Sequence, residues 1–524
     1  MNPSHRREFL EDVGRGMLLA GVGAPLALEL GLASTARAEE ESKTLTFGDL
    51  EPLVALLQET PKEKLLPALA AKHKAGTDLR TLTAAGAFAN ARTFGGEDYF
   101  GFHTFMALAP AYQMAQQLPK AEQPLPIWKV LYRNAHYTQS HGGRSKDVLR
   151  KIEPKPAPMT GEKVREAVNT GNGGEAEKRL AALGSPEDAL NAAILGVEDN
   201  HDVHSAVMPW RAWVMLDFVG KDHAITMLRQ SVRQTAKRCA DSHAKPEQLA
   251  QTRKLLPMLL DQHKLLEGPK GKRTGDNLWL AGLCETVLTS KPDQSGGAVA
   301  AALAEGFSPE QVGEAISLAA NQLLLRQVEN MGGNMGFRTH GDSAGVHMSD
   351  ETNAWRNMAR VASPRNRAAG LILAAVDIAR HWDYSTNRKP TPGHQKDPYP
   401  WKEHTLDVKG TTADELLKEL DGAVRENRQV RACAIVHQYA TKGFEAKPVF
   451  ALLRQYMISE DGRLHNEKYY QTVVEEFATT RPAFRWRQLM GLARVAASSY
   501  GYSQQDKQDG RAPGYEESRK LLGI

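Results

Sequence analysis

Apolar side chains recur at spacings of three and four residues along most of this 524-residue chain. That spacing lines one face of an α-helix. The stretches 180–195, 277–288 and 368–382 carry it, and so do the longer stretches 206–239, 414–439 and 469–500, each of which predicts a continuous helix. Alternation with a period of two, which is typical of strands, is scarce. The sequence therefore predicts an all-α fold.

Three short phrases indicate where helices begin. Ser185-Pro186 and Ser308-Pro309 combine a capping hydroxyl with a proline, which fits the first helical turn, and acidic or amide residues follow both. Thr412 precedes Asp414 and Glu415 in the same manner. We expect a helix to start at each of these places.

The first 38 residues resemble a twin-arginine export signal. Arg6 and Arg7 precede an apolar run over 17–28, and Ala36-Arg37-Ala38 has the small-x-small pattern that signal peptidase cleaves. The apolar run is shorter than the roughly 20 residues that span a bilayer, which disfavours the alternative of a membrane anchor. We expect residues 1–38 to be removed and the mature protein to be exported or periplasmic. The twin-arginine export machinery, which carries folded proteins, is then a partner.

The mature chain shows two similar stretches. Gly101-Phe102-His103 is followed by Met114-Ala115, and Gly345-Val346-His347 is followed at the same offset by Met358-Ala359. We interpret residues 39–250 and 251–524 as two related helical halves. Such halves would form a helical array or an α/α toroid-like bundle.

Composition excludes several classes of function. The formal net charge is +4, from 66 basic and 62 acidic residues, and no basic block stands out, so nucleic acid is not an expected partner. No later apolar run is long enough to span a membrane, and we expect a soluble mature protein without a transmembrane segment. The three cysteines form no CxxC motif. P-loop, dinucleotide-binding, HExxH and GxSxG motifs are absent, which disfavours nucleotide-dependent and α/β-hydrolase chemistry.

The densest polar stretch predicts a metal site. If residues 198–204 are helical, Glu198, His201 and His204 lie on one face, at a spacing that lets a carboxylate and two imidazoles bind one ion. A divalent transition metal is the cofactor this set indicates. The alternative is a polar helix end with solvated or structural histidines.

A second set predicts acid–base or ligand chemistry. His340, Asp342 and His347 lie in a glycine-rich stretch, where Asp342 could orient an imidazole that acts as a general base. His103 and His136 are the matching candidates in the first half. The alternatives are an ordinary polar loop for the first set and a core histidine at His103, whose sequence neighbours are strongly apolar.

Two functions remain open from sequence. The first is an exported enzyme that acts on a small organic substrate through a histidine and carboxylate cluster, with or without a bound metal. Oxidoreductase-type chemistry is slightly favoured for it. The second is a noncatalytic helical-repeat protein that binds a ligand or a partner. Convergence of histidines from the two halves on one enclosed place would favour the enzyme.

Overall fold

The structure is a computed structural model that describes residues 43–154, 158–241, 246–326, 343–386, 397–462, 465–501 and 511–524. The predicted signal peptide lies outside these ranges. Within them every regular element is a helix, and strand-like pairing is confined to the isolated bridges Thr44–Arg150 and Arg273–Phe307. The all-α prediction is confirmed. None of the helices in the described ranges combines the length and the apolar composition that crossing a bilayer demands.

Where the structure describes it, the first half of the chain contains ten α-helices. They are α4 (Glu51–Glu59), α5 (Lys62–Lys74), α6 (Leu79–Phe94), α7 (Tyr99–Ala115), α8 (Pro124–Ser140), α9 (Gly161–Asn169), α10 (Gly173–Ala181), α11 (Pro186–Asp199), α12 (Val203–Val219) and α13 (Ala224–Ala240). Short 3-10 turns occur at Gly48–Leu50, Gly143–Lys146 and Lys221–His223.

The other described helices follow these along the chain. They are α14 (Pro246–Gln262), α15 (Asn277–Thr289), α16 (Pro292–Ala304), α17 (Pro309–Leu325), α18 (Ala344–Val361), α19 (Pro364–Thr386), the short α20 (Lys402–Thr405), α21 (Ala413–Arg425), α22 (Gln429–Thr441), α23 (Ala446–Ser459), α24 (Asn466–Thr479), α25 (Trp486–Ser499) and α26 (Tyr515–Leu522).

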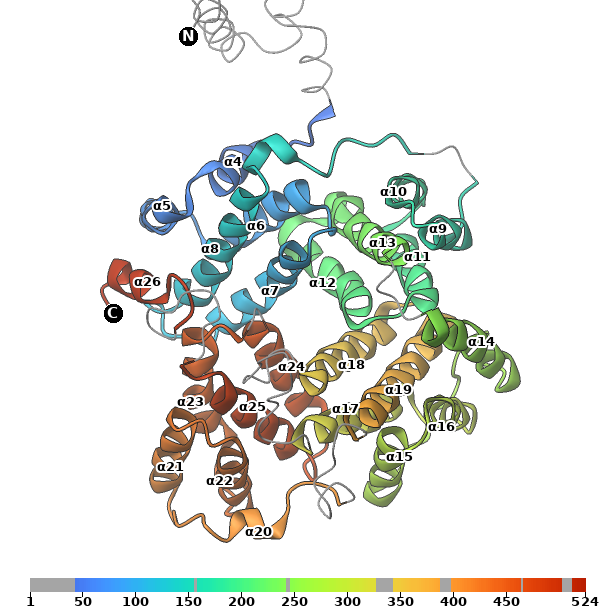
Figure 1. Cartoon of the computed structure of the whole chain (residues 1–524), viewed down its shortest axis with the longest axis vertical. Helices are drawn as coiled ribbons and strands as arrows, with labels where there is room; N and C mark the ends of the chain where they lie inside the picture. Colours follow the sequence, from blue (N-terminus) through green and yellow to red (C-terminus); the bar gives the residue numbers. More distant parts are fainter. Residues whose placement is uncertain are drawn as a thin grey trace, which may run out of the picture.

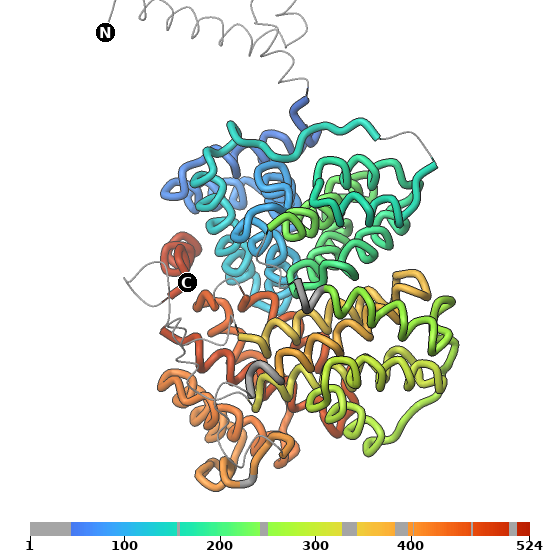
Figure 2. Tube along the Cα trace, turned by 45° about the vertical axis from the view of Figure 1, so that its right-hand side comes forward, coloured from blue at the N-terminus to red at the C-terminus, as the bar shows by residue number. Residues whose placement is uncertain are grey.

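Four helices, α7, α12, α18 and α24, meet in the middle of the molecule (Figures 1 and 2). We call them the central helices. α7 contacts α12 and α24, and α18 contacts the same two, so the four form a closed cycle. Two of them come from each half of the chain. Their junction is therefore the place where the two halves meet.

The helices around this junction pack in matching order. α7 packs between α6 and α8, as α18 packs between α17 and α19. α13 contacts α10 and α12, as α25 contacts α22 and α24. Large buried side chains fill the spaces between these layers, among them Trp128 and Trp355.

The predicted helix starts are present. The hydroxyl oxygens of Ser185 and Ser308 accept hydrogen bonds from the backbone N–H three residues on, at 3.0 and 3.4 Å. Thr412 forms a capping box with Glu415, in which each side chain accepts a hydrogen bond from the other residue's backbone N–H. A capping hydroxyl satisfies a helix N–H that has no partner within the helix, which explains why these sequence signals were reliable.

The three long helices predicted as continuous are each divided, and these predictions were wrong. Gly220, at φ +87°, ends α12, and Asn427, at φ +57°, separates α21 from α22. These left-handed conformations cannot continue an α-helix. α24 ends at Thr479, and Thr480 is extended just before Arg481-Pro482. The proline biases its predecessor away from the helical region.

The glycines of the two Gly-x-His stretches allow close helix packing. A Cβ atom at Gly101 would lie 2.4 Å from the Phe94 ring of α6, and one at Gly345 would lie 2.5 Å from Leu324 Cα of α17. Both distances are far inside van der Waals contact. The glycines therefore set how closely α7 and α18 approach their neighbours, and with that the positions of the histidines two residues later.

Replacing Gly345 with alanine should reduce the free energy of unfolding by about 1–3 kcal/mol, because the new methyl group meets the backbone of α17. Gly282→Ala is the matched control, since a Cβ atom there meets nothing within 4 Å and alanine is favoured in a helix. Denaturant titration measures both. Equal stabilities for the two variants would contradict the packing role.

Candidate metal centre

Four histidine rings converge at the junction of the central helices. His103 is in α7, His204 in α12 and His347 in α18, and His465 precedes the first residue of α24. The ring centroids are 4.7 Å apart for His103–His204, 5.4 Å for His204–His347, 4.7 Å for His347–His465 and 5.1 Å for His465–His103. The contacts thus close a ring of four, which we call the histidine cluster.

Ring nitrogens of three cluster histidines are close enough to share an ion. His103, His204 and His465 each offer a ring nitrogen, and these three atoms all lie within 4.8 Å of one another. The Nε2 atoms of His103 and His204 are buried and accept no hydrogen bond from any described residue. Buried polar atoms are rarely left in that state without a ligand or water. The geometry fits a metal ion bound by imidazole nitrogens.

Hydrogen bonds at the other ring nitrogen orient the imidazoles. His103 Nδ1 donates to the Tyr99 carbonyl oxygen at 2.6 Å, and His347 Nδ1 donates to the Ser343 carbonyl oxygen at 3.1 Å. In both cases the acceptor is four residues earlier. His204 Nδ1 lies 3.2 Å from Asp202 Oδ1. Because a carbonyl oxygen can only accept a hydrogen bond, Nδ1 carries the proton in His103 and His347. The lone pair of these two rings is therefore on Nε2, as in many protein metal sites.

Burial favours the neutral form of three of the four cluster histidines. Burial, and after it the neighbouring His204, lowers the pKa of His347 to about 3. Burial also holds the pKa values of His103 and His465 well below their ordinary range, with a second contribution from the positive charge of Lys468. Neutral imidazoles are the form that binds a metal. At neutral pH these three histidines are ready to act as ligands without losing a proton.

The structure does not bring Glu198, His201 and His204 together. α11 ends at Asp199 and α12 begins at Val203, with the Asp202 side chain capping α12, so the segment is not one helix. Both carboxylate oxygens of Glu198 accept hydrogen bonds from Arg365. Only His204 of the three joins the histidine cluster.

His201 belongs to a separate buried network. Its Nε2 lies 2.8 Å from Glu351 Oε1 and its Nδ1 lies 3.2 Å from Asp377 Oδ2. Burial alone would lower the pKa of His201, but the two carboxylates raise it to about 10. The two carboxylates thus favour the protonated form of His201, while burial raises the pKa of Glu351. The three side chains are also near enough to one another to hold a metal, but both ring nitrogens already face carboxylates.

The other predicted site residues fall in different places. His347 and His103 are in the cluster, as described above. His136 lies in α8 with its ring 5.1 Å from that of Tyr137, outside the cluster. His340 and Asp342 lie outside the described residues. His465 had only weak sequence signals, although pairing it with His204, which also stands at the start of a central helix, could have identified it.

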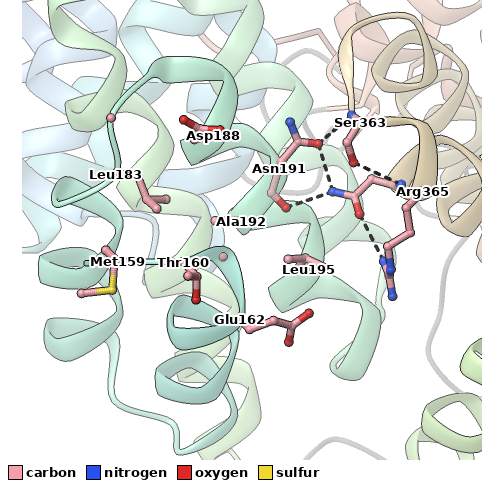
Figure 3. A pocket seen from close by; sticks show the side chains of 13 residues that line it. Met159, Thr160, Glu162, Leu183, Asp188, Asn191, Ala192, Leu195, Ser363 and Arg365 are labelled. Carbon is pink, nitrogen blue, oxygen red and sulfur yellow. Dashed lines mark hydrogen bonds between the residues drawn. The ribbon is translucent and has the colours of Figure 1, made fainter. Parts of the chain in front are cut away.

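A polar hollow of about 370 Å³ lies elsewhere, between α9, α11 and the start of α19 (Figure 3). Asn191 and Asn366 line this hollow and are hydrogen-bonded to each other, with Asn366 Nδ2 donating to Asn191 Oδ1 at 3.0 Å. The Ser363 backbone N–H donates to the same Asn191 oxygen at 2.8 Å. These bonds tie α11 to α19, and no cluster histidine lines the hollow.

Comparisons with models of protein families, with curated proteins and with solved structures gave no match.

Replacing His201 with glutamine should reduce the free energy of unfolding at pH 7 by about 3–5 kcal/mol, because two buried carboxylates lose their cation. In the unaltered protein the contribution of His201 is fully present below pH 6.5 and is lost as the pH rises through about 10, since the folded pKa is raised. Denaturant titrations at pH 7 and pH 10 measure this. His263→Gln is the control. A loss of stability in His201→Gln no greater than in the control would contradict the ion-pair assignment.

Proposed function

We propose that the chain is a metalloprotein in which His103, His204, His347 and His465 hold one divalent transition-metal ion. The observation that carries the proposal is the convergence of four histidines, from both halves of the chain, on one buried place. The orienting hydrogen bonds at Nδ1 support it, because they direct the Nε2 lone pairs away from the backbone.

The donor set limits the kind of metal. Imidazole nitrogen suits zinc, copper, iron and nickel, whereas calcium and magnesium prefer oxygen ligands. In the His201 network both ring nitrogens face carboxylates. We therefore propose a nitrogen-ligated transition metal. Iron or copper would supply redox chemistry, and zinc would supply a Lewis acid or an activated water.

Partial exposure of the cluster favours an enzyme. His103 and His465 are 1% and 2% exposed. The side chain of His204, in contrast, is 15% exposed, and His347 is also partly exposed. The Nε2 atoms of both rings are nevertheless buried. We propose that a small organic substrate would approach a metal held there from the side of His204 and His347, since a catalytic metal keeps one position open. The alternative is a noncatalytic protein in which the metal only joins the two halves, and the ligands' origin in both halves favours that role.

We also propose that the two halves arose by duplication. The matching order of helix contacts supports this. Gly101 and Gly345 occupy corresponding places in their helices and pack closely against α6 and α17 respectively. His103 and His347 are held by the same hydrogen bond to the carbonyl four residues earlier.

Metal analysis of the mature protein tests the central proposal. The protein should be produced without a polyhistidine tag and purified without chelators. We expect about one transition-metal ion per chain, which His204→Ala or His465→Ala should abolish. Metal at a thousandfold excess over its dissociation constant should also raise the free energy of unfolding by about 4 kcal/mol relative to the metal-free protein.

His263→Ala is the control, because His263 stands at the end of α14 and takes no part in the cluster. It should bind metal as the unaltered protein does. A well-folded protein that takes up no metal after incubation with zinc, copper and ferrous iron would refute the proposal. A bound metal with no water-exchangeable position would favour the noncatalytic alternative.

Export can be tested separately. Replacing Arg6 and Arg7 together with lysine should keep the precursor in the cytoplasm, because a twin-arginine signal depends on both guanidinium groups. Fractionation and N-terminal sequencing of the exported form, expected to begin at Glu39, measure the outcome. Unchanged export of the double variant would contradict this route.

A further inference from the structure

Two neighbouring aromatic rings stand on the surface beside the histidine cluster. Tyr99 is 49% exposed and Phe100 is 42% exposed. Across the described part of the chain they are the two exposed aromatic residues, and the other exposed large apolar side chains are aliphatic. Aromatic rings usually bury most of their surface. An adjacent exposed pair at this place therefore needs an explanation.

The pair is continuous with the cluster. The Tyr99 ring centroid lies 4.3 Å from that of His103 and 5.8 Å from that of His204. The Phe100 ring contacts Tyr99 at 5.5 Å and stacks on Tyr137 at 4.5 Å with an interplanar angle of 11°. These rings form an aromatic surface that runs from solvent to two of the four imidazoles.

α18, the corresponding helix in the second half, has no aromatic residues at the equivalent positions. The residues four and three positions before His347 are Ser343 and Ala344, where the first half has Tyr99 and Phe100. Ser343 still orients its histidine through its backbone carbonyl, as Tyr99 does. The aromatic side chains are therefore not needed to build the helix start or to hold the imidazole.

The rim of the surface is polar. Asp98, which caps α7, lies 2.9 Å from His141 Nε2, and the His141 side chain is 41% exposed. A stable protein interface buries about 800 Å² on each partner, and two half-exposed rings offer only a small part of that area. The surface thus fits a small molecule better than another protein.

We propose that Tyr99 and Phe100 bind a planar aromatic small molecule and present it to the metal held by the histidine cluster. This inference rests on the proposed function and names the substrate class of the same site. The Tyr99 and Phe100 rings are perpendicular, at 90°, so a planar ligand that stacks on one ring meets the edge of the other. Both kinds of ring contact are favourable beyond the area they bury. The reacting group of the ligand then lies beside the His103 and His204 rings that Tyr99 contacts.

The test compares two probes of equal skeleton, 2-naphthol and its saturated analogue decahydro-2-naphthol. Isothermal titration is carried out on the zinc-loaded full chain and on Tyr99→Leu and Phe100→Leu. We expect tighter binding of 2-naphthol than of the saturated probe. Each leucine variant should weaken 2-naphthol binding roughly 3- to 10-fold and leave the saturated probe nearly unchanged. Leu278→Ala, at a residue that is 83% exposed outside the cluster, is the control.

Metal content is measured on the same samples, so that the two proposals fail separately. Equal binding of the two probes, or unchanged 2-naphthol affinity in both leucine variants, with metal still bound, overturns this inference alone. Self-association that is lost in Phe100→Leu, without an effect on 2-naphthol, would make the surface a protein interface and also overturns it. Absence of metal in every sample overturns the proposed function.

Discussion

The structure depends on keeping four imidazoles together where four helices cross. A buried imidazole favours its uncharged form, and each ring must be held at one nitrogen so that the other faces its neighbours. The helix starts supply that hold, through carbonyl oxygens one turn earlier in α7 and α18. Gly101 and Gly345 permit the close approach of these helices to α6 and α17, and with it the positions of the His103 and His347 rings.

Buried charges near the cluster tie the same helices together. Arg211 in α12 donates to Asp350 in α18 at 2.6 Å, and Thr472 in α24 donates to the same carboxylate oxygen at 3.1 Å. Asp350 follows His347 by one helical turn. Buried charges are tolerated only when they are paired and hydrogen-bonded, so each of these groups restricts where its helix can lie. The polar network and the cluster therefore depend on one helix arrangement.

Local sequence patterns predicted the type of secondary structure and several helix starts, but not where the long helices end. Helix type and three helix starts follow from periodicity and capping, whereas the ends at Gly220 and Asn427 depend on single left-handed residues that periodicity does not reveal. For the site, the repeated Gly-x-His stretches identified His103 and His347. His204 was predicted to bind a metal together with Glu198 and His201, but the structure places those two residues in other hydrogen-bond and ion-pair networks. His465 was in neither predicted set, because its position depends on the crossing of α24 with α7 and α18, and no spacing within one helix encodes that crossing.

The placement of the ligands along the chain has a consequence for biosynthesis. A ribosome releases His103 and His204 first, His347 well afterwards and His465 last of the four. Two imidazoles on a partly made chain would hold a metal weakly, because the remaining donors are missing. A metal bound as proposed would therefore be held tightly only after His465 has been made, and a chain that ends before His465 would not retain it. Metal retention would then report that synthesis had passed the fourth ligand.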